Sequence, residues 1–246
     1  MTGPARQLGL LGDDGSPDGA WRVRASERAR RLAVRVLPGG LVEIVVPRGT
    51  RPRAVEQFVS RHRRWIERTV DLYRPAGADA TGALPDTIHF PASGRTYGVT
   101  YVGGIGAPRL SVAAGALSVA GALDRTALVR RALQRFTMRE AHAALAPWLA
   151  ELSAATSLGY SRMQIRRQRT RWGSCSPTGT ISLNACLMFQ PPPVVNYLLI
   201  HELAHTRHFN HSRRYWRLVE RFEPDWHELD AALSRGWRAV PAWALA

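Results

Sequence analysis

Three residues near the C-terminal end of the chain, His201, Glu202 and His205, have the types and the spacing of a catalytic metal site. They form the pattern H-E-x-x-H. Residues four apart on a helix lie about 6 Å apart along its axis and on one face, so both imidazoles can bind one ion at roughly 2.0–2.1 Å. The glutamate can then take a proton from a metal-bound water. The pattern therefore predicts a hydrolytic zinc centre.

The residues before the motif favour a buried helix that carries it. Three prolines at 191–193 suit a helix start, because the missing N–H of proline costs nothing in the first turn. The residues that follow are apolar on nearly every side, which predicts burial: Val194, Val195, Leu198, Leu199, Ile200 and Leu203. A carboxylate and two histidines in a buried helix are costly unless something binds them, which argues against an accidental motif.

A third ligand must come from beyond this helix. His208 lies about 10.5 Å along the axis from the first histidine of the motif, too far to share one ion on a straight helix. Asn210 tolerates the left-handed conformation that ends helices, so the chain can turn there and bring His211 back to the metal. Glu220 and Glu223 are rival ligands, as in zincins that use a distal glutamate. His211 is the preferred prediction, with His208 at the surface or behind the ligands.

Length and composition predict a globular protein of the cytoplasm. With 246 residues the chain can form one large or two small domains. It has no apolar run of about eighteen residues and no charged-then-apolar leader, so neither a membrane span nor a secretory signal is expected. Cys175 and Cys186 lie at different distances from a predicted turn, which favours free thiols in a reducing compartment.

Arginine dominates the charge of the chain. The net charge is +15 and no lysine occurs. Ten arginines lie between Tyr160 and Glu223, against three glutamates. Such an excess is typical of a well-solvated surface, and it can also attract an anionic partner such as nucleic acid, although no recognised nucleic-acid motif accompanies it. Weak nucleic-acid binding through these arginines is an expectation, and the oligomeric state is left open.

The pattern along the chain predicts an α+β protein in three segments. Residues 1–19 are rich in Gly, Pro and Asp and are expected to be disordered. Residues 20–123 are predicted to form a β-rich region with one helix. Its antiparallel strands begin at Trp21, and Thr50 is the expected helix cap. Residues 124–246 are predicted to form the catalytic domain.

The catalytic segment is predicted to begin with a long helix from Asp124 to about Ala155. Two strands are expected next, at residues 162–172 and 180–189, joined by the turn sequence S-P-T-G. The metal helix follows. Ser212 is then predicted to cap a further helix.

Several motifs in a fixed order resemble those of the YgjP-like metallopeptidase family. They are R-W-G-S-C at residues 171–175, L-N at 183–184, H-E-L-A-H at 201–205 and N-H-S-x-x-Y-W at 210–216. The strong resemblance covers about residues 166–226, and a weaker one covers the N-terminal strands and the helix with Trp65 and Ile66. The family is related to the zincins that include the SprT-type and WLM-type proteases.

The resemblance implies a minimal zincin-like domain, in which a short antiparallel sheet lies over the H-E-x-x-H helix. Position by position, His201, His205 and His211 match the family's zinc ligands, and Glu202 matches its catalytic base. The family usually has no histidine at position 208, so the resemblance assigns no role to His208. Some members are described as nucleotide pyrophosphatases, so membership implies the metal site more firmly than the substrate.

Three further residues are candidates for contact with substrate or with a developing oxyanion. Arg171 and Ser174 belong to R-W-G-S-C, and Tyr215 follows the third histidine. A structural role competes in each case. The tryptophan and cysteine of R-W-G-S-C can pack under the hairpin, with Gly173 permitting close approach, and Tyr215 falls on an apolar helical stripe.

The predicted function is that of a zinc-dependent peptidase in which Glu202 activates a zinc-bound water. An extended peptide could add a strand at the edge of the predicted hairpin that contains residues 180–189. Two alternatives remain: a metal-dependent nucleotide pyrophosphatase whose arginines clamp phosphates, and a basic nucleic-acid-binding protein with a structural zinc. A structural zinc is normally closed by four ligands and needs no neighbouring glutamate, which argues against the last.

Overall fold

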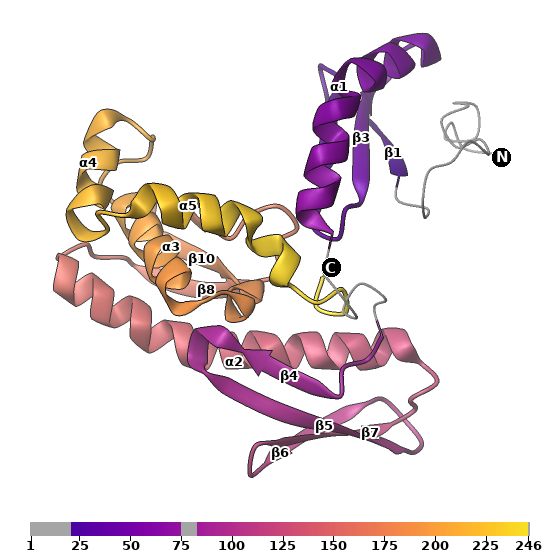
Figure 1. The fold of residues 1–246 in the computed structure, drawn as a ribbon, viewed down its shortest axis with the longest axis vertical. Coiled ribbons are helices and arrows are strands. Elements are labelled where there is room, and N and C mark those ends of the chain that lie inside the picture. Colours follow the sequence, from indigo (N-terminus) through magenta and orange to yellow (C-terminus); the bar gives the residue numbers. More distant parts are fainter. Residues whose placement is uncertain (1–20, 75–82, 246) are drawn as a thin grey trace. The chain divides into compact units, whose positions relative to one another are not determined.

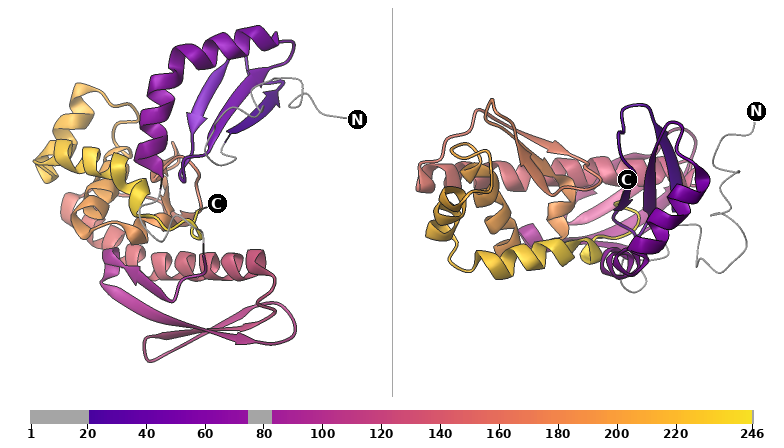
Figure 2. Two further views of the ribbon diagram at one scale, coloured as in Figure 1. Left: turned by 45° about the vertical axis from the view of Figure 1, so that its right-hand side comes forward. Right: turned by 90° about the horizontal axis from the view of Figure 1, so that it is seen from above.

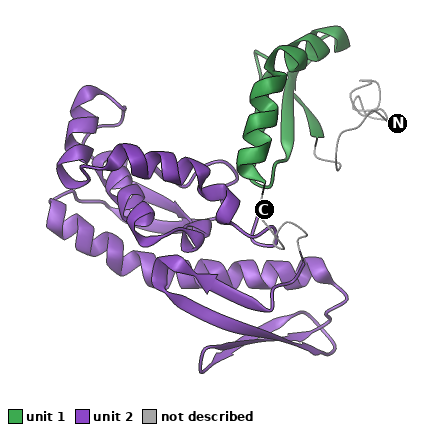
Figure 3. Ribbon diagram, in the orientation of Figure 1, with its two compact units in different colours: residues 1–76 green, residues 77–246 purple. Residues whose placement is uncertain are grey.

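The computed structural model describes residues 21–74 and 83–245, and the chain divides into two compact units, Met1–Ala76 and Gly77–Ala246 (Figure 3). The segment 1–19, expected to be disordered, lies outside the described residues. The division falls between residues 76 and 77, whereas the sequence favoured 123 and 124. The difference arises because a second sheet, expected in the N-terminal region, packs on the long helix of the second unit.

The first unit is a three-stranded sheet with one face covered by a helix. Its strands are β1 (Trp21–Ser26), β2 (Ala33–Val36) and β3 (Val42–Pro47), and its helix is α1 (Pro52–Tyr73). Alternate residues of a strand point to the same face. Val42, Ile44 and Val46 of β3 accordingly pack in clusters with Val55 and Ile66 of α1.

This first sheet is mixed, whereas an antiparallel one was expected. The strand order is β1-β3-β2, so β3 lies between the other two, parallel to β1 and antiparallel to β2. The expected cap, Thr50, donates instead to the carbonyl oxygen of Pro47 at 2.8 Å, and Arg51 is the residue that precedes the helix. Trp65 of this helix is 44% exposed, whereas the neighbouring Ile66 is buried.

The second unit contains a four-stranded sheet on a long helix. The strands are β4 (Thr87–Phe90), β5 (Arg95–Gly103), β6 (Arg109–Ala113) and β7 (Ala116–Gly121), in the order β4-β5-β7-β6, and the helix is α2 (Thr126–Thr156). The long helix confirms the prediction, except that its start has no side-chain cap. In Figures 1 and 2, α2 has this sheet on one side and the remaining elements of the unit on the other.

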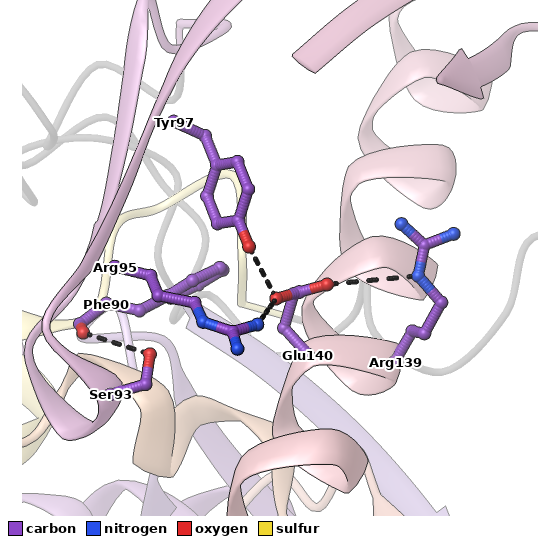
Figure 4. Close-up of polar contacts among 6 residues, drawn as sticks. All are labelled: Phe90, Ser93, Arg95, Tyr97, Arg139 and Glu140. Atoms are coloured by element: carbon purple, nitrogen blue, oxygen red, sulfur yellow. Dashed lines mark hydrogen bonds and ion pairs between the residues drawn. The ribbon is translucent and has the colours of Figure 1, made fainter. Parts of the chain in front are cut away.

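A buried carboxylate joins this sheet to α2 (Figure 4). Glu140 of α2 accepts a hydrogen bond from the hydroxyl of Tyr97 at 2.6 Å and one from Nη1 of Arg95 at 3.2 Å. Nε of Arg139 lies 3.9 Å from its other oxygen. The negative charge is thereby hydrogen-bonded and balanced, which a buried carboxylate requires.

The other side of α2 carries a second small sheet and three helices. The strands are β8 (Arg162–Arg166), β9 (Gly173–Cys175) and β10 (Thr180–Asn184), and the helices are α3 (Pro192–Ala204), α4 (Arg213–Phe222) and α5 (Trp226–Arg235). No helix in the described ranges has both the length and the apolar character needed to cross a membrane.

This second sheet is also mixed, whereas a short antiparallel sheet was expected. Its order is β8-β10-β9, with β10 antiparallel to β9 across the predicted S-P-T-G turn and parallel to β8. The single strand expected at 162–172 is interrupted, because residues 167–172 cross from one side of β10 to the other. The strand expected to reach residue 189 ends at Asn184, whose side chain accepts from the N–H of Cys186 and begins a short 3-10 helix, Ala185–Phe189. Both cysteines are free thiols, as predicted.

Candidate metal centre

Helix α3 places the first two histidines of the H-E-x-x-H motif on one face. It begins at Pro192, and all six apolar residues predicted to bury it are buried. His201 lies in its last turn, and His205 follows the last helical residue with helical φ and ψ of −64° and −20°. The two rings therefore stay close, with their centroids 4.9 Å apart.

His211 returns to this pair from the loop between α3 and α4. Its Nε2 lies 3.4 Å from Nε2 of His201, and one ring nitrogen from each of His201, His205 and His211 lies within 4.8 Å of the others. Two nitrogens bound to one tetrahedral zinc are about 3.3 Å apart, given bonds of about 2.05 Å. The spacing of these nitrogens thus suits a shared ion.

The other candidate ligands are not part of this cluster of three histidines. Glu223 accepts a hydrogen bond from Asn196 at 2.5 Å, and Glu220 is exposed on α4. His208 contributes its backbone, since its carbonyl oxygen lies 3.1 Å from Nδ1 of His205. This contact orients the ring of His205 from behind, as hydrogen bonds to metal-binding histidines usually do.

Aromatic residues of α4 and α5 pack around the histidines. The ring of Tyr215 stacks on His205, with centroids 4.6 Å apart and an interplanar angle of 27°. Trp216 stacks on His211 at 5.4 Å and 23°, and Trp226 stacks on Trp216 at 4.0 Å and 13°. The loop-borne histidine is therefore held by a stack of rings.

Glu202 is buried under β9, with 3% of its surface exposed. A Cβ added to Gly173 would lie 2.5 Å from its Oε1, so the glycine of R-W-G-S-C leaves the space that the carboxylate occupies. Its Oε2 is buried and has no hydrogen-bond partner among the described residues. Burial raises the pKa of Glu202 to about 8, against the opposing charge of Arg171.

The candidate substrate contacts differ in their position. Arg171 is exposed and influences Glu202 by its charge. Ser174 follows Gly173 in β9, so its side chain lies on the face of the sheet opposite to Glu202. The hydroxyl of the buried Tyr215 donates to the carbonyl oxygen of His201 at 3.1 Å, which favours a packing role over an oxyanion role.

The donor set fits a catalytic zinc. Burial, with the nearby His205 and His211, lowers the pKa of His201 to about 3, and burial also lowers the pKa of His205. Both rings are therefore neutral near pH 7, which is the form that binds metal. Three imidazoles with a separate carboxylate beside them match catalytic sites, in which three protein ligands leave a further position open. Buried carboxylate oxygens normally have a hydrogen-bond partner, and Oε2 of Glu202 has none within the described ranges, which fits a water held beside such a site.

Comparison with known proteins agrees with this geometry. The chain matches the family model described as YgjP-like, metallopeptidase domain, over residues 30–236. The chain belongs to the YgjP-like metallopeptidase family. The match includes residues of both units, so the weaker N-terminal resemblance is part of the family domain. Membership makes the protein a metal-dependent hydrolase. No curated protein and no solved structure matches the chain.

Proposed function

We propose that this member of the family is a zinc-dependent peptidase in which Glu202 is the general base. One observation carries the proposal: three imidazole nitrogens converge beside a buried carboxylate, one oxygen of which has no hydrogen-bond partner in the described part of the chain. When bound, zinc supplies a Lewis acid and lowers the pKa of a bound water toward about 7.

Glu202 has the proton affinity that this role requires. A group that accepts a proton and then returns it works best when its pKa lies near the operating pH. Burial raises the pKa of Glu202 from the usual range of a carboxyl towards neutral pH, and the charge of a bound metal would act in the opposite direction. Glu202 takes the proton of the attacking water and passes it to the leaving amine, while β9 and α3 exclude bulk water from the carboxylate.

The outer edge of β9, an edge strand of its sheet, is the proposed binding site for an extended peptide. The N–H of Ser176 donates to Thr180 and the N–H of Asn184 donates to Trp172, at 2.9 and 2.8 Å. Backbone groups alternate along an antiparallel ladder, so those of the intervening Gly173 point away from β10. A peptide paired at this edge lies beside Glu202.

This edge refines the expectation from the sequence. The hairpin was expected to offer an edge near residues 180–189, but β10 is the central strand and β9 is the edge. Arg171 lies two residues before β9 and is exposed, so it remains the candidate for contact with a substrate carbonyl or carboxylate.

The experiment that tests the proposal combines metal analysis with two hydrolysis assays. Purified protein should carry about one zinc per chain. It should cleave members of a peptide library, and Glu202→Gln should not. Hydrolysis of nucleoside triphosphates by the wild type, without peptide cleavage, would replace the peptidase with the pyrophosphatase alternative. Full zinc content in His205→Ala would refute the metal site itself.

A further inference from the structure

A chain of hydrogen bonds reaches the back of His201 from helix α5. The hydroxyl of Tyr197 donates to Oδ1 of Asp230 at 2.8 Å and lies 3.3 Å from Nδ1 of His201. Tyr197 precedes His201 by one turn of α3, and Asp230 lies on α5, which packs against α3. Tyr197 is fully buried and Asp230 is partly buried, so water competes poorly for these contacts.

The carboxylate at one end of this chain determines the direction of its hydrogen bonds. An ionised carboxylate only accepts, so the Tyr197 proton is directed to Asp230. The Tyr197 oxygen can then only accept from Nδ1 of His201, which requires the imidazole tautomer with its hydrogen on Nδ1. That tautomer leaves a lone pair on Nε2, the atom that faces Nε2 of His211 at 3.4 Å.

We propose that Tyr197 and Asp230 are positioning residues for the metal centre, which hold His201 in the tautomer and orientation that present Nε2 to the ion. The negative charge of Asp230 also acts on the imidazole of His201, through the hydrogen bonds of Tyr197 and from the side opposite Nε2. The inference rests on the metal site of the proposed function, and it assigns to α5 a role in metal affinity. Hydrogen-bonded groups behind a ligand histidine typically contribute about 10- to 100-fold to affinity.

His205 is supported in a different way. Its Nδ1 faces the backbone carbonyl oxygen of His208, which is present whatever side chain stands there. The Tyr215 hydroxyl bonds to the backbone of His201 and therefore has no effect on the tautomer of the ring. Among the residues behind the ligands, Tyr197 and Asp230 should therefore be the ones whose substitution lowers zinc affinity most.

The test compares Tyr197→Phe and Asp230→Asn with a matched control, Tyr97→Phe, in the full-length protein. The Tyr97 hydroxyl also donates to a carboxylate, that of Glu140 (Figure 4), where β5 packs on α2. Competition with a chromogenic chelator should show the zinc Kd raised about 10- to 100-fold in the first two variants. The control should bind zinc like the wild type. The melting temperatures of metal-free Tyr197→Phe and Tyr97→Phe should both fall, because each loses a buried hydrogen bond.

A spectroscopic measurement separates positioning from packing. Nitrogen–proton correlation NMR of the metal-free protein should show His201 protonated on Nδ1 in the wild type and in both tautomers in Tyr197→Phe. If Tyr197→Phe does not fold, Asp230→Asn carries the test, because it keeps the size of the side chain.

The outcomes distinguish this inference from the proposed function. Zinc affinity equal to that of the wild type in both variants, with zinc lost in His201→Ala, would overturn the positioning role and leave the metal site intact. A wild-type protein that binds no zinc, or a His201→Ala variant that binds it as tightly, would overturn the metal site and the positioning role together.

Discussion

His201 lies in the last turn of a buried helix and His205 directly follows it, whereas His211 comes to the same point from a loop, and different interactions hold the two regions in place. Helical spacing fixes the first pair, and hydrogen bonds from Nδ1 orient both of its rings. His211 is exposed and is held by stacking on Trp216. The spacing of the first pair therefore follows from the α3 helix itself, whereas the position of His211 depends on packing between α4 and α5.

The largest effect should come from removing a ligand in either region. His205→Ala and His211→Ala should each lose most of their zinc after dialysis, because two remaining imidazoles bind a shared ion poorly. Glu220→Ala and Glu223→Ala are the matched controls and should keep full zinc content. Zinc lost from either glutamate variant but kept by His211→Ala would assign the third ligand to a distal glutamate.

The next effect separates catalysis from metal binding within the helical region. Glu202→Gln keeps the size of the side chain but removes the base, so peptide hydrolysis should fall by at least about a hundredfold. Zinc content and melting temperature should change little, because Glu202 is not among the clustered ligand atoms. Turnover equal to that of the wild type would remove Glu202 from the proposed mechanism.

A smaller effect is expected from the strand that covers Glu202. Gly173→Ala places a Cβ 2.5 Å from Oε1 of Glu202, so either the carboxylate or β9 must move. Displacement of a catalytic group by about 1 Å can cost up to about a hundredfold in rate, and we expect a loss within that range with zinc retained. Gly98→Ala in β5 is the control, since no atom of the described residues lies within 4 Å of its added Cβ. Equal activity in the two variants would show that β9 can adjust.

The same contrast explains how much of the site the sequence could predict. Two ligands and the base lie within one helical turn, so their spacing alone indicated the chemistry. His211 required a chain reversal inferred at Asn210 and a resemblance to known motifs. Asp230 had no local signal, because it reaches His201 only through the packing of α5 on α3. Tyr197 could have been found, since it lies four residues before His201 on the same face.

The fold shows a similar limit. Alternating apolar residues located most strands, but they carry no information on partner or direction. The parallel pairs β1–β3 and β8–β10 were therefore missed, since the two strands of each pair are not consecutive in the chain. The four-stranded sheet was assigned to the N-terminal region for the same reason. Its packing on α2 involves contacts such as Phe90 and Tyr97 with Phe136, which are far apart in the chain.

The smallest effect should come from the ring stack that holds His211. Trp216→Leu removes an aromatic contact worth about 0.5–1.5 kcal/mol, which corresponds to an increase of roughly two- to tenfold in the zinc Kd. Trp226→Leu removes only the outer ring, which touches Trp216 and not His211, so its effect on the Kd should be smaller still. Competition with a chelator measures the zinc Kd of both variants and so tests the expected order of the two effects. The melting temperatures of the metal-free proteins are measured alongside. If Trp216→Leu binds zinc like the wild type while His211→Ala does not, the loop backbone positions His211 without help from the stack. The two regions would then be equally preformed, and the contrast between helix and loop would disappear.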